Sequence, residues 1–130
     1  MTVDNENTFI SLNIGVITVS DTRNETNDKS GDFLSKAIND AKHCLFARRI
    51  IPDEIKEIQD IIKEWVSTNN FDAIITTGGT GLTGRDVTPD AILPLLDKEI
   101  SGFSTLFHQI SSSKIGTSTI QSRALGGIYN

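Results

Sequence analysis

The sequence has few of the residues that cross-link, stiffen or anchor a chain. Its 130 residues include one Cys, three Pro, one Trp and one Tyr. The single cysteine, Cys44, can form no disulfide within the chain, which fits a reducing compartment. No apolar run approaches the roughly 20 residues that a membrane span needs. Acidic residues stand near the start, where a signal peptide has basic ones. We therefore expect a cytoplasmic protein without a membrane partner.

Positive charge is also scarce. Lys and Arg number 12 against 17 Asp and Glu, so the formal net charge is −5. A protein that binds nucleic acid needs a basic surface to contact phosphates, and this composition argues against such a partner. An anionic ligand would have to find its positive charge locally.

The length and composition predict one globular domain over residues 1–130. Hydrophobic residues make up 37% and charged residues 22%, which is typical of neither a disordered tail nor a fibre. A chain of this size buries about two-thirds of its unfolded surface, enough for a stable core. The first eight residues are polar and are expected to form a frayed arm.

Apolar runs rich in β-branched residues alternate with segments of helical periodicity. Strands are predicted over 12–19, 45–51 and 71–76, and the second lies nearer a sheet edge because Arg48 and Arg49 interrupt it. Between them, one helix is predicted after Ser30 as N-cap, with an apolar stripe that includes Phe33, and another over 55–66. This order predicts an α/β fold with a mainly parallel sheet.

The second half of the chain is less regular. Thr88 as N-cap and Pro89 at the first helical position predict a helix start, and Pro94 keeps that helix short or kinked. A further apolar helical stripe covers 103–110. Residues 116–130 show no clear period, and their last apolar residues stand where another strand is expected.

Polar segments follow each predicted strand, at 20–23, 52–54 and 76–90. The carboxyl ends of parallel strands meet at one edge of a sheet, where ligands bind, so these segments predict a site. Adjacent glycines in the third segment allow a close backbone approach and inward N–H groups that suit a phosphate. Residues 79–84 match the letters G-x-G-x-x-G, but the helix starts too late for a dinucleotide fingerprint, and Arg85-Asp86 replaces the Lys-[Ser/Thr] of a Walker A loop.

Asp53 and Asp86 are the candidate magnesium ligands. Magnesium usually takes one or two protein carboxylates and completes its shell with water and phosphates. Each aspartate has an alternative interpretation: Asp53 as a helix N-cap, and Asp86 as a loop residue that bonds its own backbone. One Cys and two His are too few for a zinc site.

Three arginines and two serines are further candidates for contacts with a phosphorylated ligand. Arg23, Arg85 and Arg123 could supply positive charge, or could be solvated surface residues. Ser118 and Ser122 could donate hydrogen bonds to phosphate or pterin groups, or could simply build turns.

Five segments together resemble the MoaB/Mog family of molybdenum cofactor biosynthesis. They are GVITVSDTR (15–23), DKSG (28–31), IPDE (51–54), TTGGTGLTGRDVTPDA (76–91) and GTSTIQSRALGG (116–127). The resemblance covers nearly the whole chain in the family's order, and the fourth string is highly specific. The DKSG and SDTR forms favour the MoaB-type branch.

The resemblance implies a three-layer α/β/α fold, assembled as a homotrimer or homohexamer, that binds molybdopterin. Active members of the family transfer an adenylyl group from MgATP to the molybdopterin phosphate and release pyrophosphate. By resemblance, the chain would be a molybdopterin adenylyltransferase with Mg²⁺ as cofactor and ATP and molybdopterin as substrates. The alternative is a non-catalytic molybdopterin-binding or assembly protein of the MoaB type.

The motifs also assign the expected site. The family's two magnesium-linked aspartates match Asp53 and Asp86, which are therefore the expected catalytic and metal-binding residues. The expected substrate-binding residues come from the first strand end, the glycine loop and the late Ser/Thr/Arg segment: Ser20, Asp21, Thr77, Gly78, Gly79, Thr80, Gly81, Arg85, Ser118, Ser122 and Arg123. Family members continue past the position of Gly127 into a further strand, a turn and a C-terminal helix, which are not expected within residues 1–130.

Overall fold

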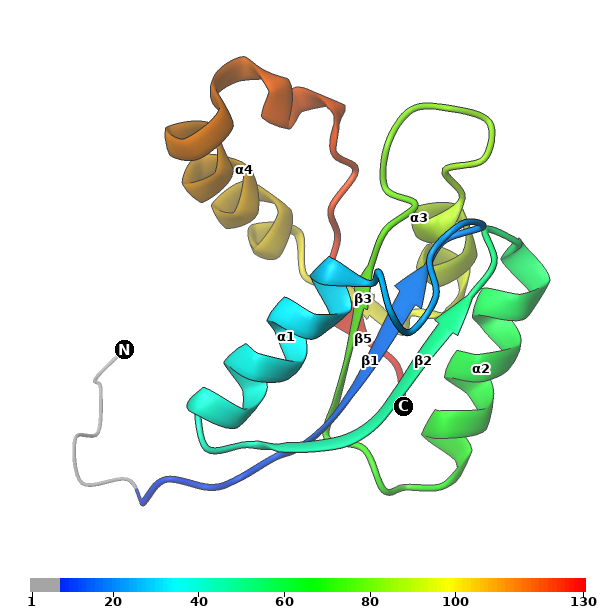
Figure 1. Cartoon of the computed structure of the whole chain (residues 1–130), viewed down its shortest axis with the longest axis vertical. Helices are drawn as coiled ribbons and strands as arrows, with labels where there is room; N and C mark the ends of the chain where they lie inside the picture. Colours follow the sequence, from blue (N-terminus) through cyan, green and yellow to red (C-terminus); the bar gives the residue numbers. More distant parts are fainter. Residues whose placement is uncertain (1–7) are drawn as a thin grey trace.

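A parallel sheet lies at the centre of the molecule. The computed structural model describes residues 8–130, so most of the predicted polar arm falls outside the described residues. Strands β1 (Asn13–Val19), β2 (Cys44–Ile51) and β3 (Ala73–Thr77) pair in parallel in the order β2-β1-β3 (Figure 1). The three predicted strands and their parallel pairing are confirmed. The prediction that β2 lies at an edge is also confirmed, because it pairs with β1 alone in this sheet.

Two helices cover opposite faces of the sheet. Alternate residues of β1 point to opposite faces, so Val16 packs toward α1 (Lys29–Asp40) and Ile17 packs toward α2 (Ile55–Ser67). Both side chains are fully buried, and burying an aliphatic side chain of this size contributes about 1.5–3 kcal/mol. Figure 1 shows α1 and α2 on the two sides of the strands. The predicted α/β fold with three layers is thereby confirmed.

The α2 face owes its close packing to a glycine in the central strand. A Cβ on Gly15 would lie 2.5 Å from the indole ring of Trp65. The missing side chain leaves room for that ring, which stacks on Phe71 with ring centroids 4.6 Å apart. Trp65 is only 7% exposed, and aromatic pairs of this kind add about 0.5–1.5 kcal/mol to the area they bury.

Two predicted helix starts and one predicted core residue are wrong. Asp28, not Ser30, caps α1, because its carboxylate accepts the Gly31 N–H. Thr88 is the first residue of α3 (Thr88–Ile92) instead of its N-cap, and its hydroxyl donates to the Gly78 carbonyl. Phe33 is 72% exposed, although it falls within the predicted stripe of α1. The short helix before Pro94 is confirmed: α3 passes into the 3-10 turn η1 (Leu93–Leu95).

The last third of the chain is loosely packed. Helix α4 (Ser101–Ile115) is longer than predicted, has no buried side chain and projects away from the sheet (Figure 1). It continues into the 3-10 helix η2 (Gly116–Gln121), which the sequence did not predict. The expected late strand is β5 (Gly127–Ile128), which pairs antiparallel with β4 (Lys98–Glu99) and not with β3. Within residues 8–130, no helix combines the length and apolar character needed to cross a membrane.

Candidate functional site

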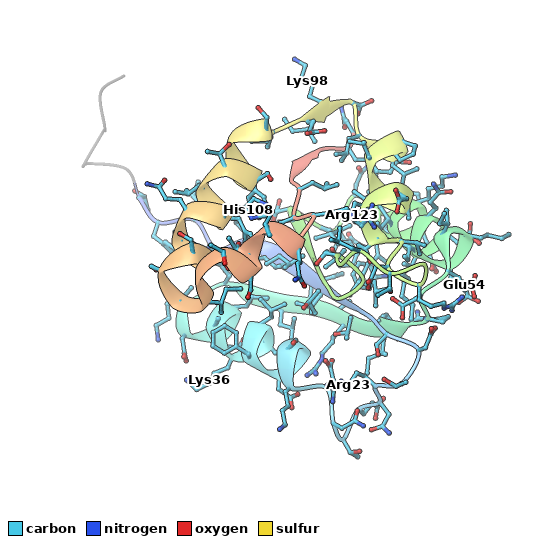
Figure 2. The ribbon with its side chains drawn as sticks, turned by 90° about the horizontal axis from the view of Figure 1, so that it is seen from above. Arg23, Lys36, Glu54, Lys98, His108 and Arg123 are labelled. Carbon is cyan, nitrogen blue, oxygen red and sulfur yellow. The ribbon has the colours of Figure 1, made fainter. Side chains whose placement is uncertain are left out.

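The three predicted polar segments meet at the carboxyl ends of the parallel strands. Figure 2 views the molecule from this end, with Arg123 near the centre and Arg23 and Glu54 toward the rim. Asp21 follows β1, Asp53 follows β2, and the loop from Gly78 to Val87 follows β3. The sheet therefore brings together side chains that lie more than 30 residues apart in the sequence.

Asp21 and Asp53 bind each other's backbone. The Asp21 N–H donates to Asp53 Oδ2 at 2.9 Å, and the Asp53 N–H donates to Asp21 Oδ1 at 3.0 Å. This reciprocal pair fixes the end of β1 to the end of β2. Asp53 does not cap α2, because Glu54 holds the N-cap position and makes no capping side-chain bond. The helix-cap interpretation of Asp53 is therefore wrong.

The glycine loop lies against both candidate magnesium ligands. Gly79 has φ +68°, and a Cβ there would lie 3.1 Å from Asp53 Oδ1 and would overlap the Thr88 hydroxyl. A Cβ on Gly81 would lie 2.6 Å from Asp86 Oδ2. Gly79 has a backbone conformation that favours glycine, and a side chain at Gly81 would force the Asp86 carboxylate to move. The structure therefore places the carboxylate of Asp53 beside Gly79 and the carboxylate of Asp86 beside Gly81, at two nearby positions of the same loop.

Asp86 forms hydrogen bonds within its own loop, as one interpretation of the sequence predicted, but only through one carboxylate oxygen. Asp86 Oδ2 accepts the Thr83 N–H at 3.0 Å and the Thr83 hydroxyl at 2.7 Å. These side-chain and backbone hydrogen bonds lower the pKa of Asp86. Both bonds go to Oδ2, so Asp86 closes its own loop and still presents a charged carboxylate.

Asp53 has the least favourable environment for a negative charge. Burial raises the pKa of Asp53, and the neighbouring carboxylates of Asp21 and Asp86 raise it further. The pKa of Asp21 is lowered, first by the hydrogen bond from the Asp53 backbone and then by Arg85. Like charges held close together favour protonation or the arrival of a cation. The charge at Asp53 is therefore only partly neutralised by the protein itself.

The fit of these residues to magnesium can be judged from their donor atoms. Among residues 8–130, no three His, Cys, Asp or Glu side chains are arranged to hold a metal ion by themselves. Magnesium, however, keeps several waters and uses one or two carboxylates together with substrate phosphates. Asp53 and Asp86 supply hard oxygen donors beside a loop suited to phosphate, so the residues present fit the ion.

Arg85 faces the protein's own acidic groups. Its guanidinium donates to both oxygens of Asp21 at 3.0 Å and to Glu54 Oε1 at 3.1 Å. Glu54 lies in the predicted polar segment 52–54 and ends the IPDE motif, but the sequence assigned it no role of its own. The role of Arg85 in binding substrate stays a prediction, and in this structure its charge is already matched.

Arg123 holds the glycine loop in shape. Its Nε donates to the Gly81 carbonyl at 2.9 Å, its Nη2 donates to the Asp86 carbonyl, and its Nη1 donates to Asp90 at 3.0 and 3.2 Å. Its backbone N–H donates to the Thr80 carbonyl at 2.8 Å. The side chain therefore joins residues 80–90 to the late segment, a bridge that no spacing in the sequence indicates.

Two hollows adjoin the site. A cavity of about 160 Å³ lies between β1, β3 and α1, and three predicted substrate-binding residues line it: Ser20, Thr77 and Gly78. A larger groove of about 780 Å³ runs along β3 beside α4 and the last residues. Its lining includes Thr77, Gly78, Thr80, Ser122 and Arg123. Ser118 lies exposed in η2 and is not part of either lining.

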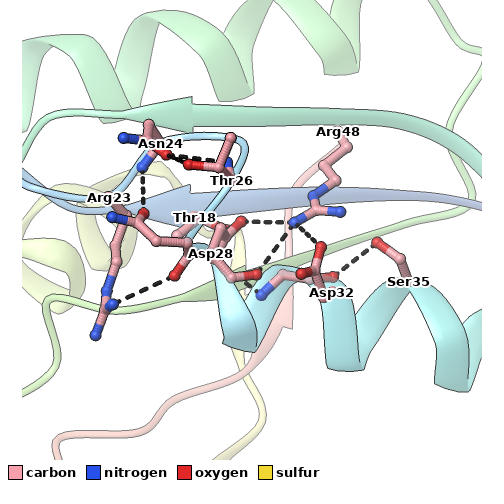
Figure 3. Close-up of polar contacts among 10 residues, drawn as sticks. Thr18, Arg23, Asn24, Thr26, Asp28, Asp32, Ser35 and Arg48 are labelled. Carbon is pink, nitrogen blue, oxygen red and sulfur yellow. Dashed lines mark hydrogen bonds and ion pairs between the residues drawn. The ribbon is translucent and has the colours of Figure 1, made fainter.

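A buried aspartate near the small cavity was missed by sequence reasoning. Asp28 is 1% exposed and accepts hydrogen bonds from the Thr18 hydroxyl at 2.8 Å, the Gly31 N–H at 3.0 Å and Arg48 at 2.9 Å (Figure 3). Arg48 also binds Asp32 at 2.8 Å. Burial raises the pKa of Asp28, but the hydrogen bonds outweigh it and keep this pKa below its usual value. The bond from the Arg48 guanidinium has the largest lowering effect. An arginine within an apolar strand was the signal that could have revealed this pair.

Comparison with known proteins decides the family. The model of a family described as a probable molybdopterin binding domain matches residues 15–129. The chain belongs to this molybdopterin-binding domain family. The molybdenum cofactor biosynthesis protein B of Escherichia coli K12 is 38% identical over 122 residues, which are 94% of this chain and 72% of that protein. A probable molybdopterin adenylyltransferase of Methanocaldococcus jannaschii is 37% identical over 126 residues, covering 92% of this chain and 74% of its own.

Solved structures agree with this assignment. A crystal structure of a molybdenum cofactor biosynthesis protein B superposes with a TM-score of 0.89 at 40% identity, covering 95% of this chain and 77% of that chain. The tungsten cofactor synthesizing protein MoaB from Pyrococcus furiosus superposes with a TM-score of 0.81 at 35% identity, covering 95% and 76%. The resemblance to the MoaB/Mog family is confirmed.

Proposed function

We propose that the chain binds molybdopterin and transfers an adenylyl group to its phosphate from ATP complexed with magnesium. The observation that carries this proposal is the position of Asp53 and Asp86 beside Gly79 and Gly81. The M. jannaschii relative named a probable molybdopterin adenylyltransferase supports it. A cytoplasmic location is part of the same proposal.

The proposed reaction exchanges one phosphate linkage for another. An oxygen of the molybdopterin phosphate attacks the α-phosphorus of ATP, the bond from that phosphorus to the bridging β-oxygen breaks, and pyrophosphate leaves. Asp53 and Asp86 would hold Mg²⁺, which when bound neutralises the charge of the nucleotide phosphates. Backbone N–H groups of the glycine loop would orient the nucleotide, and Arg123 keeps that loop in position. Positioning and charge neutralisation then supply most of the rate enhancement.

The proposal is tested by pyrophosphate release. The wild-type chain with molybdopterin, ATP and magnesium should release pyrophosphate, and omission of any one of the three should stop it. Asp86→Asn should bind molybdopterin and turn over at least about 10³-fold more slowly, an effect of about 4 kcal/mol on the barrier. Asp40→Asn, at an exposed ion pair of α1, is the matched control and should keep wild-type turnover. Normal turnover in Asp86→Asn would contradict the mechanism.

A non-catalytic molybdopterin-binding role is the second candidate. It is favoured by Arg85, whose guanidinium is held by Asp21 and Glu54 and so presents no free charge to a nucleotide. Under this alternative, calorimetry would detect molybdopterin binding by the wild-type chain but no heat from ATP with magnesium. Magnesium-dependent ATP binding would exclude it.

We also propose that the chain assembles as a homotrimer or homohexamer. Its support is the exposed apolar surface of α4, where Phe103, Leu106, Phe107 and Ile110 are each between 39% and 56% exposed. Light scattering should give a mass of three or six chains. Leu106→Asp should lower that mass, because a charge at a buried interface is costly. A monomer at micromolar wild-type concentration would contradict the proposal.

A further inference from the structure

The strand order places a ligand crevice between β1 and β3. From β1 the chain passes through α1 to β2 on one side, and then through α2 to β3 on the other side of β1. The connections thus diverge at β1, with α1 and α2 on opposite faces of the sheet. In open parallel sheets, ligands bind beyond the carboxyl ends of the two strands where the connections diverge. The small cavity lies at this point, since Thr18–Ser20 and Thr77–Gly78 both line it.

Two basic side chains from different segments line the cavity. Arg23 belongs to the loop after β1, and Lys29 is the first residue of α1. Within residues 8–130 neither side chain forms an ion pair, and Arg23 makes one side-chain hydrogen bond, to the Asn27 carbonyl at 3.2 Å (Figure 3). By contrast, Arg48, Arg85 and Arg123 are all bound to carboxylates of the protein.

The one acidic residue in the cavity wall is already neutralised. Asp28 carries an ion pair with Arg48 and hydrogen bonds from Thr18 and Gly31. Asp28 also accepts the N–H of Gly31, so this N–H at the start of α1 is already satisfied. The net charge presented to a ligand in the cavity therefore comes from Arg23 and Lys29, and it is positive.

The size of the cavity suits one chemical group. Sites that hold a whole small-molecule ligand measure roughly 300–1,000 Å³, whereas this cavity measures about 160 Å³. Its lining offers two cations and hydroxyl groups of Ser20, Ser30 and Thr77. Cations with hydroxyl donors are the usual partners of phosphate oxygens.

We propose that this cavity is an oxyanion subsite in which Arg23 and Lys29 bind a phosphate group of the ligand. The identity of that ligand rests on the proposed function, which supplies two sources of phosphate, ATP and molybdopterin. Thr77 and Gly78 line both the cavity and the larger groove, so one ligand can extend from the subsite into the groove. The subsite adds positive charge at the same sheet edge where Asp21, Asp53 and Asp86 supply negative charge.

Isothermal titration calorimetry with two charge-matched double variants tests the subsite. Arg23→Gln/Lys29→Gln should bind at least one of ATP with magnesium and molybdopterin about tenfold or more weakly than wild type. Lys36→Gln/Lys56→Gln also removes two positive charges, here from exposed ion pairs. This control should keep wild-type affinity for ATP and for molybdopterin. Both double variants should keep the wild-type Tm within a few degrees, because all four side chains are exposed.

The ligand that loses affinity identifies the source of the phosphate. Weaker ATP binding alone assigns the subsite to the nucleotide, and weaker molybdopterin binding alone assigns it to the pterin phosphate. Wild-type affinity for both ligands in Arg23→Gln/Lys29→Gln overturns the proposal. The proposal is also overturned if the wild-type chain binds none of these three: ATP, molybdopterin and inorganic pyrophosphate.

The outcome is separable from that of the proposed function. A chain that binds ATP through Arg23 and Lys29 but releases no pyrophosphate keeps the subsite and loses the adenylyl transfer. A chain that releases pyrophosphate with an unchanged KM for both substrates in the double variant keeps the transfer and loses the subsite.

Discussion

Two aspartates near the carboxyl edge of the sheet have opposite environments. Asp28, on the α1 side, is almost fully buried, yet its pKa is lowered, because hydrogen bonds led by that from Arg48 outweigh the effect of burial. Asp53, on the α2 side, is less buried, yet its pKa is raised by burial and by the neighbouring carboxylates. The protein supplies Asp28 with its own cation and leaves Asp53 among other acids.

The difference separates a structural charge from a functional one. The charge of Asp28 joins α1 to β1 and β2 and stabilises the fold. The charge of Asp53 costs stability and is suited to an external cation, as expected of residues at functional sites. Substitutions on the two sides should therefore change stability and activity in different ways.

The largest expected effect is on stability at Asp28. Asp28→Ala removes the cap of α1 and leaves Arg48, which is 27% exposed, with the exposed Asp32 as its one remaining ionic partner among the described residues. We expect a loss of about 3 kcal/mol or more in the free energy of unfolding, measured by urea denaturation at pH 7. Asp28→Asn/Arg48→Met should lose less, because it leaves no buried charge unpaired. Equal stability of wild type and Asp28→Ala would show that the Asp28 carboxylate does not stabilise the fold.

The pH dependence of this loss follows from the lowered pKa. The carboxyl is more acidic in the folded chain than in the unfolded chain, so its contribution is complete above the unfolded value of about 3.9. It disappears as the pH falls through the folded pKa. The stability difference between wild type and Asp28→Ala should therefore shrink in acid below about pH 4.

The next effect is on activity, at the residue that holds the loop beside Asp53. Arg123→Ala removes the guanidinium bonds to Gly81, Asp86 and Asp90. Turnover should fall about 100-fold, because a misplacement of about 1 Å at reacting groups has this effect. Arg123→Lys should restore little, since one ammonium cannot reproduce the planar set of donors. Reduced turnover with unchanged affinity for molybdopterin would separate loop positioning from substrate binding.

A smaller effect of opposite sign is expected at Asp53 itself. Asp53→Asn removes a poorly compensated charge and keeps an oxygen that accepts the Asp21 N–H. At pH 7 the variant should gain about 0.5–1 kcal/mol in the free energy of unfolding while losing turnover. Because the folded pKa is raised, wild-type stability falls as the pH rises from the unfolded value through the folded one. The gain should therefore vanish at low pH. A loss of stability in Asp53→Asn at pH 7 would show that the folded chain compensates the charge of Asp53.

The smallest effect is expected at Asp32, the exposed partner of Arg48. Its side chain is 61% exposed, whereas that of Asp28 is 1% exposed. Asp32→Asn should change the free energy of unfolding by no more than about 0.5 kcal/mol, as is usual for exposed ion pairs. A loss as large as that of Asp28→Ala would show that burial does not decide the strength of this network.

The regular first half of the fold could be predicted from the sequence. Continuous β-branched runs and the apolar stripe of α2 carry the signal within ten to fifteen residues, so β1, α2 and the parallel pairing were anticipated correctly. Capping could not be predicted as well, because Asp28 and Ser30 are both good N-cap residues. The network with Arg48 and Thr18, 20 and 10 residues away, selects Asp28.

In the site, the sequence indicated the residues but not their partners. Asp53, Asp86 and the glycines belong to local motifs. The sequence shows that Arg85 and Arg123 are positively charged but not what they bind. In the folded chain both form ion pairs with acidic side chains of the protein. The late segment was the hardest to predict, since η2 and β5 have little periodicity and α4 lacks a buried face within the described chain.

The order of strands and helices in the first half of the chain, the glycine loop and the resemblance to the MoaB/Mog family were determined by the sequence alone, because local periodicity and short motifs carry them. The tertiary structure alone decided which charges are compensated. Whether a carboxylate meets a guanidinium, a backbone N–H or another carboxylate depends on residues that are distant along the chain. That choice makes Asp28 a structural residue and leaves Asp53 suited to an external cation.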